Sequence, residues 1–164
     1  MNNKVSLRLY LPGDKESLER FELPEEQVLF SALPKDVLPI AIQDEHQYPV
    51  VITYEESAAG FFILHEGPDI GEFTANPHAM LLRSFSIDFR YQGQGIAKTA
   101  MLQLPNFMKS HFPGRNEVVL AVNKRNKAAQ AVYLAAGFED KGRLIDGPIG
   151  PQHIYHLQYK ERVI

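Results

Sequence analysis

The stretch on which the fold depends reads RSFSIDFRYQGQGIAK and covers residues 83–98. Its apolar first half predicts a strand, two glycines then predict a turn, and the last residues begin a helix. Gly93 and Gly95 lack a Cβ, so their backbone adopts positive φ at low cost and its N–H groups approach a ligand closely. The following helix adds unpartnered N–H groups and the positive end of its dipole. We therefore predict a phosphate-binding turn, with a simple tight connection as the alternative.

The spacing of the glycines distinguishes between families of phosphate-binding proteins. A dinucleotide fingerprint needs a third glycine and a distant acidic residue, and a Walker loop needs Gly-Lys-Ser/Thr; neither occurs here. The pattern Arg90-x-x-Gly93-x-Gly95 instead resembles the pyrophosphate signature of the GNAT N-acetyltransferases, Arg/Gln-x-x-Gly-x-Gly/Ala. Residues 126–138, NKAAQAVYLAAGF, are similar to the second signature of that superfamily, Asn-x-x-Ala-x-x-Leu-Tyr-x-x-x-Gly-Phe, with Val132 in place of leucine. The motifs follow in the expected order, and the resemblance covers essentially the whole chain.

Length and composition limit the remaining possibilities. The chain has 164 residues, no cysteine and a formal net charge of -3. This length suits one domain, residues 1–164, and the absence of cysteine excludes a disulfide framework and a thiol nucleophile. The charge lacks the basic excess of a nucleic-acid-binding protein. Residues 1–4 do not resemble the start of a signal peptide and no apolar run is long enough to span a membrane, so we expect a cytoplasmic protein. We expect a monomer or a homodimer, with no nucleic-acid or membrane partner.

Apolar periodicity and turn residues predict the order of helices and strands. The expected strands cover residues 5–11, 48–54, 59–65, 80–87, 117–122, 138–145 and 152–159. The expected helices cover residues 14–22, 34–42, 95–112 and 127–136. We expect Asp14 to cap the first helix and Pro105 to kink or split the third.

This order is that of the GNAT fold, whose class is α/β (α+β). The fold has a central, mixed but mostly antiparallel sheet of six to seven strands, flanked by about four helices. The resemblance implies that the fourth and fifth strands, residues 80–87 and 117–122, splay apart at an acetyl-CoA site.

The resemblance implies transfer of an acetyl group from acetyl-CoA to a primary amine. Backbone N–H groups of the glycine turn are expected to bind the pyrophosphate, with Arg90, Gln92 and Lys98 as side-chain partners. The fourth strand is expected to pair with the pantetheine arm, and an N–H near Ile87 to stabilise the oxyanion. The predicted acetyl-CoA contacts are Phe85, Ser86, Ile87, Arg90, Gln92, Gly93, Gln94, Gly95, Ile96, Ala97, Lys98 and Asn126.

The second signature also implies a catalytic residue. Tyr133 occupies its tyrosine position, which implies a general acid, since a phenol of pKa about 10 can protonate a leaving thiolate of pKa about 8.5. Tyr133 also lies on the apolar stripe of its helix, so a plain core position is the alternative. Asn126 begins the same helix, and both a pantetheine contact and a helix N-cap stay open for it.

The acceptor is expected to be a small-molecule amine, with polyamines as the candidate class. Four segments look like bacterial diamine and polyamine acetyltransferases: QVLF (27–30), PVVI (49–52), GFFIL (60–64) and RSFSID (83–88). Two other functions stay open. One is acetylation of a protein or peptide amine, and the other is non-catalytic binding of acyl-CoA.

The general base is not identified by the sequence. Glu25, Glu26, Glu72 and His65 lie in segments that can reach the acceptor, with a solvated surface position as the alternative for each. Ala121 stands where some protein-directed relatives supply a glutamate, so that source of a base is absent. The histidines show no ligand spacing, and we predict no metal site.

Overall fold

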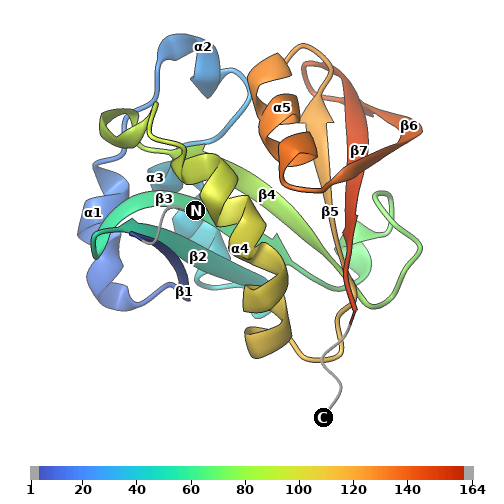
Figure 1. Ribbon diagram of the computed structural model, residues 1–164, viewed down its shortest axis with the longest axis horizontal. Helices are drawn as coiled ribbons and strands as arrows, with labels where there is room; N and C mark the ends of the chain where they lie inside the picture. Colours follow the sequence, from blue (N-terminus) through green and yellow to red (C-terminus); the bar gives the residue numbers. More distant parts are fainter. Residues whose placement is uncertain (1–3, 161–164) are drawn as a thin grey trace.

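The computed structural model describes residues 4–160 (Figure 1). The expectation that the chain does not begin with a signal peptide falls largely on residues 1–3, outside the described residues. Seven strands form one sheet in the order β1-β2-β3-β4-β5-β7-β6. Neighbouring strands are antiparallel, except that β4 and β5 are parallel, which confirms the mixed, mostly antiparallel sheet. The strands are β1 (Val5–Leu9), β2 (Gln47–Tyr54), β3 (Ser57–His65), β4 (Ala79–Ile87), β5 (Glu117–Asn123), β6 (Glu139–Gly147) and β7 (Gly150–Gln158).

Helices cover both faces of the sheet. They are α1 (Lys15–Glu19), α2 (Glu25–Val28), α3 (Pro34–Ala41), α4 (Ile96–His111) and α5 (Lys127–Ala135), with single 3₁₀ turns at Pro12–Asp14, Pro68–Ile70 and Phe89–Tyr91. Within residues 4–160, no helix combines the length and the apolarity needed to cross a membrane.

The side chains of β2 show how the two faces are separated. Val50 and Ile52 belong to the core beneath α4, whereas Val51 between them packs with Leu18 of α1 and Leu38 of α3. This alternation follows from the two-residue period of a strand. The sheet therefore lies between α4 and α5 on one side and α1 and α3 on the other, and Figure 1 shows α4 crossing the near side.

Of the two outcomes predicted for Pro105, a split of the third helix is wrong. The helix α4 runs without interruption from Ile96 to His111 with Pro105 inside it. Proline removes one helical hydrogen bond. However, Met101, Leu104 and Met108 are each 0% exposed, and this buried stripe stabilises the helix across the proline.

The start of the chain also differs from the prediction. The first strand ends at Leu9, and Asp14 does not cap the first helix with its side chain. Its carboxylate instead accepts hydrogen bonds from Nη1 and Nη2 of Arg8, each at 2.6 Å, and from the Leu11 N–H at 2.8 Å. The bond to Arg8 lowers the pKa of Asp14. A charged partner on the preceding strand thus outcompetes the helix terminus.

Two hairpins are tighter than predicted, because strand pairing continues further. The turn between β2 and β3 has only Glu55 and Glu56, with φ of 48° and 72°. Positive φ at both central residues matches the twist of the flanking strands. The turn between β6 and β7 is likewise reduced to Pro148 and Ile149.

Candidate active site

The strands β4 and β5 part midway along their length. They pair only through Ala79–Leu81 and Glu117–Val119. Beyond this point β4 stays paired with β3 as far as Ile87, whereas β5 stays paired with β7 as far as Asn123. The facing backbone edges are therefore left without a neighbouring strand, which confirms the predicted splay. A space of about 470 Å³, which we name the β4–β5 cleft, lies between them.

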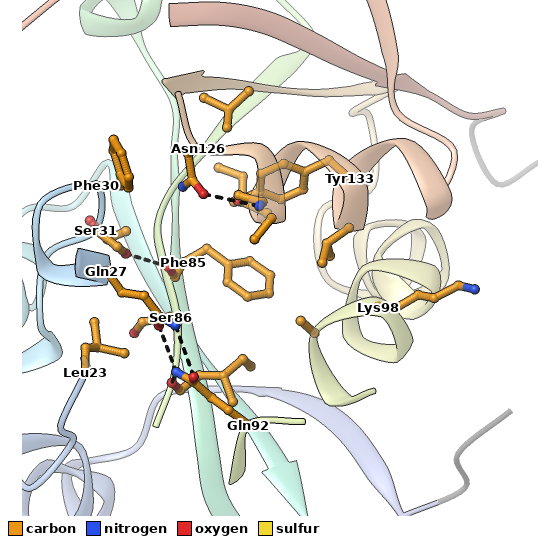
Figure 2. A pocket seen from close by; sticks show the side chains of 18 of the residues that line it. Leu23, Gln27, Phe30, Ser31, Phe85, Ser86, Gln92, Lys98, Asn126 and Tyr133 are labelled. Atoms are coloured by element: carbon orange, nitrogen blue, oxygen red, sulfur yellow. Dashed lines mark hydrogen bonds between the residues drawn. The ribbon is translucent and has the colours of Figure 1, made fainter. Parts of the chain in front are cut away.

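Most of the predicted acetyl-CoA contacts meet around this cleft. Its lining includes Phe85, Ser86, Ile87, Gln92, Gly93, Gly95, Ile96, Ala97, Lys98, Asn126 and Tyr133. Arg90 and Gln94 are outside the lining. Figure 2 shows the Lys98 side chain extending away from the centre of the cleft, where Phe85 and Tyr133 lie.

A β-bulge in β4 shapes one wall of the cleft. The register with β3 shifts here, and Ser84 has φ of 59°, which is uncommon for a residue other than glycine. The neighbouring Phe85 has no partner residue on β3, and its carbonyl accepts a hydrogen bond of 2.6 Å from the Ser31 hydroxyl (Figure 2). The bulge therefore ties β4 to the segment that follows α2.

The glycine turn has the predicted conformation. Gly93 and Gly95 have φ of 81° and 77°, and Gly95 is the N-cap of α4. An added Cβ at either position would meet no atom within 4 Å, so backbone conformation rather than space requires glycine. The first α4 hydrogen bond runs from the Thr99 N–H to the Gly95 carbonyl, and the N–H groups of residues 96–98 precede it. These groups are available to an anion at the mouth of the cleft.

Gln92 joins the glycine turn to two other elements. Its amide nitrogen donates to the Ile87 carbonyl at 2.8 Å and lies 2.8 Å from the Gln27 amide oxygen. Gln27 in turn donates to the Gln92 amide oxygen at 3.1 Å. Figure 2 shows this paired contact at the end of β4. The short helix α2 is thereby attached to the predicted phosphate-binding turn.

Arg90 makes a structural contact in this structure. The Arg90 Nε lies 2.9 Å from one carboxylate oxygen of Asp88, and an Arg90 Nη lies 2.7 Å from the same oxygen. Asp88 is 0% exposed. The other Asp88 oxygen accepts the Glu22 N–H at 3.0 Å. The motif arginine therefore neutralises a buried carboxylate that holds the chain entering α2. This role was not predicted from the sequence.

The position of Tyr133 is compatible with both of the roles that the sequence left open. It is 8% exposed, and its ring centroid lies 5.9 Å from that of Phe85, edge-on, and 5.5 Å from that of Phe138, in a tilted arrangement. Tyr133 also lines the cleft. No group of residues 4–160 hydrogen-bonds its hydroxyl. Burial raises the pKa of Tyr133 far above the ordinary value of 10.0, because the phenolate is poorly solvated there. The phenol consequently keeps its proton at physiological pH.

Two polar side chains complete the lining. The Asn126 oxygen accepts the Ala129 N–H at 3.3 Å and so caps α5, while Asn126 also borders the cleft. Ser86 is 4% exposed, and its buried hydroxyl has no hydrogen-bond partner in the part of the chain that the structure describes. A buried hydroxyl without a partner is rare, and a polar ligand in the cleft offers one.

A second space of about 520 Å³, which we name the adjoining cavity, continues from the cleft. The residues shared by both linings are Phe30, Ser31, Leu82, Arg83, Ser84, Ala121 and Gln152. The two spaces therefore meet at the β4 bulge. The ionisable groups that line the adjoining cavity are His65, Asp69, Glu72 and Arg83.

The candidate bases fall into two groups. His65 and Glu72 line the adjoining cavity, whereas Glu25 and Glu26 are exposed on α2 and line neither space. Gln27, Ser31 and Asp69 were not predicted as site residues. Each is a single polar residue in an irregular or very short segment, where no periodic pattern marks it.

Comparison with known proteins agrees with this geometry. Residues 15–138 match the model of the Acetyltransferase (GNAT) family. The chain is 41% identical over 157 residues to an uncharacterized N-acetyltransferase of Bacillus subtilis strain 168, YbbJ, covering 95% of this chain and 98% of YbbJ. It is 24% identical over 140 residues to the spermine/spermidine N(1)-acetyltransferase of the same organism, covering 85% of this chain and 91% of that one.

The fold is also similar to solved structures. The aminoglycoside acetyltransferase AAC(6')-Ib, solved with coenzyme A and kanamycin, superposes with a TM-score of 0.76 at 19% identity, covering 94% of each chain. The family match spans the glycine turn, the parting strands and Tyr133. The chain therefore belongs to the GNAT family of acetyltransferases and is an N-acetyltransferase that uses acetyl-CoA.

Proposed function

We propose that the protein acetylates a primary amine of a small molecule by direct attack in a ternary complex. Acetyl-CoA occupies the β4–β5 cleft, and the amine enters through the adjoining cavity. The observation that carries this proposal is that the two spaces meet at Arg83, Ser84 and Ala121. Separate entrances that converge at one point suit a reaction in which neither substrate leaves before transfer. A cavity of about 520 Å³ is of the size that small ligands occupy.

The residues of the cleft fit acetyl-CoA. The N–H groups of residues 96–98 and the left-handed glycines suit a pyrophosphate, while the free edges of β4 and β5 suit an amide-containing arm. The Ser86 hydroxyl is a further polar partner. When bound, acetyl-CoA supplies a thioester whose carbonyl carbon accepts the amine and whose sulfur departs. Backbone N–H groups of residues 84–87, near Ile87, are our candidates for stabilising charge on the carbonyl oxygen.

Tyr133 is our candidate general acid. Its hydroxyl is unpaired within the described residues and its raised pKa keeps it protonated, so a proton is available when negative charge develops on sulfur. The ring is positioned by Phe85 and Phe138, which leave it little freedom. Because a phenol with a raised pKa is a weaker acid, Tyr133 first donates a hydrogen bond to the sulfur and transfers its proton only as the thiolate departs, and the proton lost by the attacking nitrogen restores the phenol. In this role it returns to the neutral phenol within each turnover.

The acceptor class within small amines is not decided by the comparisons. Polyamines are supported by the name of the 24% identical Bacillus relative and by two carboxylates, Asp69 and Glu72, at the adjoining cavity. Arg83 lines the same cavity and opposes an acceptor that carries only positive charge. Glu72, through water, is our candidate for taking the proton of the acceptor ammonium.

The test is release of free CoA from acetyl-CoA, followed with a thiol reagent. The chain has no cysteine, so the protein itself gives no background. The panel contains polyamines, amino acids, aminoglycosides and short peptides, and mass spectrometry identifies the acetylated amine. We expect turnover of one small-amine class.

Turnover of peptides alone would replace the proposal by a peptide acceptor. Tight acetyl-CoA binding measured by calorimetry, with no transfer to any amine, would instead indicate a binding module. Spermidine as the best substrate would establish the polyamine class.

A further inference from the structure

Arg83 differs from the other arginines that the structure describes. Each of the others contacts an oxygen atom: Arg8 with Asp14, Arg20 with Glu16, Arg90 with Asp88, Arg115 with Glu66, Arg125 with the Ile149 carbonyl, and Arg143 with the Phe73 carbonyl. Arg83 has no carboxylate within 4.0 Å among residues 4–160, and its one side-chain contact is an imidazole nitrogen. Arg83 lines both spaces. It thus presents donors to the point where the acceptor amine meets the thioester.

His65 fixes where Arg83 lies. The Arg83 Nη1 is 3.4 Å from the His65 Nδ1, and His65 is 6% exposed. Because a guanidinium can only donate, Nδ1 must carry the lone pair, and the ring proton is on Nε2. The Nε2 atom is buried without a hydrogen-bond partner in residues 4–160, and the nearest carboxylate oxygen, of Asp69, is 3.7 Å away.

This tautomer of His65 also affects whether His65 can act as the general base. Burial and the neighbouring Arg83 lower the pKa of His65, so the imidazole stays neutral at physiological pH. Its basic nitrogen is already engaged by the guanidinium, so it cannot also take a proton from the acceptor. His65 is therefore better suited to hold Arg83 than to act as the general base.

The negative charges of the adjoining cavity come from one segment, which contacts with β6 hold in place. Asp69 and Glu72 lie in the connection between β3 and β4 and line the cavity with Arg83. Arg143 of β6 donates to the backbone carbonyls of Glu72 and Phe73, the second at 2.8 Å. The cavity therefore has positive charge at the β4 bulge and negative charge on this segment. A ligand with both an ammonium and an anionic group complements this arrangement, whereas a ligand of one sign does not.

We propose that the acceptor amine carries a carboxylate, as an amino acid does, and that Arg83 binds this carboxylate while His65 positions Arg83. This inference rests on the proposed function, since it names the acceptor of the same site. The guanidinium can present two parallel N–H groups to a carboxylate, the geometry for which arginine is preferred over lysine. Arg83 is then a specificity-determining residue, and His65 is a positioning residue.

The first experiment compares amino acids with their own amides as acceptors. Amidation removes only the carboxylate charge, and putrescine and spermidine serve as purely cationic acceptors. Rates are divided by the fraction of unprotonated amine, because amidation also lowers the pKa of the adjacent ammonium. We expect kcat/KM for the preferred amino acid to exceed that of its amide by about 10- to 100-fold, the value of a charge-assisted hydrogen bond.

The second experiment uses variants of the anchor. Arg83→Gln should remove the preference for the carboxylate by raising KM for the amino acid about 10- to 100-fold. KM for the amide and KM for acetyl-CoA should change less than about threefold. Arg20→Gln is the matched control, because Arg20 is an exposed arginine directly after α1 and lines neither space. His65→Ala should weaken the preference, and His65→Gln, whose amide oxygen can accept from Arg83, should restore part of it.

The outcomes separate the two proposals. The carboxylate anchor would be overturned if amides or polyamines were acetylated as efficiently as amino acids. It would also be overturned if Arg83→Gln lowered kcat/KM equally for an amino acid and for its amide. Either result would leave the acetyltransferase function intact. If no amine is acetylated, calorimetry with CoA present measures amino-acid binding directly. Binding that depends on Arg83 would then support the anchor without the proposed function, and its absence would overturn both.

Discussion

The β4–β5 cleft and the adjoining cavity share a wall but are built differently. The cleft depends on backbone: two left-handed glycines, the start of α4 and the free edges of two strands. Its lining comes mainly from two stretches, residues 82–98 and 121–133. The adjoining cavity depends on ionisable side chains from β3, β4 and the segment between them. The difference shows why the co-substrate can be inferred from short motifs, whereas the acceptor must be inferred from charges that come together only on folding.

The largest expected effect is on the chemistry at the cleft. Tyr133→Phe should lower kcat about 100-fold or more, with KM for acetyl-CoA changed less than about twofold, because a general acid acts on the transition state rather than on binding. Stability should hardly change, since the hydroxyl has no partner within residues 4–160. Steady-state kinetics and thermal unfolding measure both.

Tyr155→Phe is the matched control for this prediction, because Tyr155 is also buried, with 2% exposed, and lines neither space. Equal losses of kcat and acetyl-CoA affinity in Tyr133→Phe would mean that the tyrosine only packs the wall. The cleft would then be a binding element without its own acid.

The next effect tests whether the cleft depends on backbone conformation. Gly95→Ala places a Cβ at φ of 77°, which costs about 1–2 kcal/mol, although the Cβ itself meets no atom within 4 Å. We expect KM for acetyl-CoA to rise about tenfold while the preference among acceptors stays unchanged. Gly13→Ala is the control, since its Cβ also meets nothing within 4 Å and its φ is not positive. A changed acceptor preference in Gly95→Ala would contradict the separation of the two spaces.

A smaller effect should follow from untying α2. Gln27→Ala removes the amide pair with Gln92, a loss of about 1 kcal/mol, or roughly fivefold in KM for acetyl-CoA. The exposed Gln43→Ala serves as the control. If Gln27→Ala changed KM for the acceptor instead, α2 would belong to the adjoining cavity rather than to the cleft.

The smallest expected effect is an absence of pH dependence. A raised pKa means that the Tyr133 phenol stays protonated to a higher pH than free tyrosine, so kcat should not fall between pH 7 and about 10 through loss of this proton. On the acid side, kcat/KM for the acceptor should fall as the amine becomes protonated. The prediction fails if kcat of the wild type decreases as the pH rises from 7 to 10 and kcat of Tyr133→Phe does not. The Tyr133 hydroxyl would then be more accessible to solvent than its burial in the structure indicates.

Much of the fold was predictable because its signals are local. Apolar runs bounded by turn residues located the strands, and the two sequence motifs located the glycine turn and the start of α5. The unpredicted contacts occur where a side-chain ion pair forms at a residue for which the sequence suggests another role. Asp14 is a good helix cap by type, yet it binds Arg8 of β1. Arg90 of the phosphate motif also pairs with Asp88, a contact that the motif does not predict. Neither partner choice follows from residue type or spacing.

By itself, the sequence determined the family, the glycine turn that suits a pyrophosphate and the position of Tyr133, because each depends on residue types at fixed separations along one segment. Only the tertiary structure decided that Ser84 begins a bulge, that His65 holds Arg83 and that Asp69 and Glu72 face the same cavity. These arrangements depend on contacts between strands and loops far apart in the chain. The proposed charge complementarity between the adjoining cavity and the acceptor depends on distances between these side chains, and the linear sequence does not contain those distances.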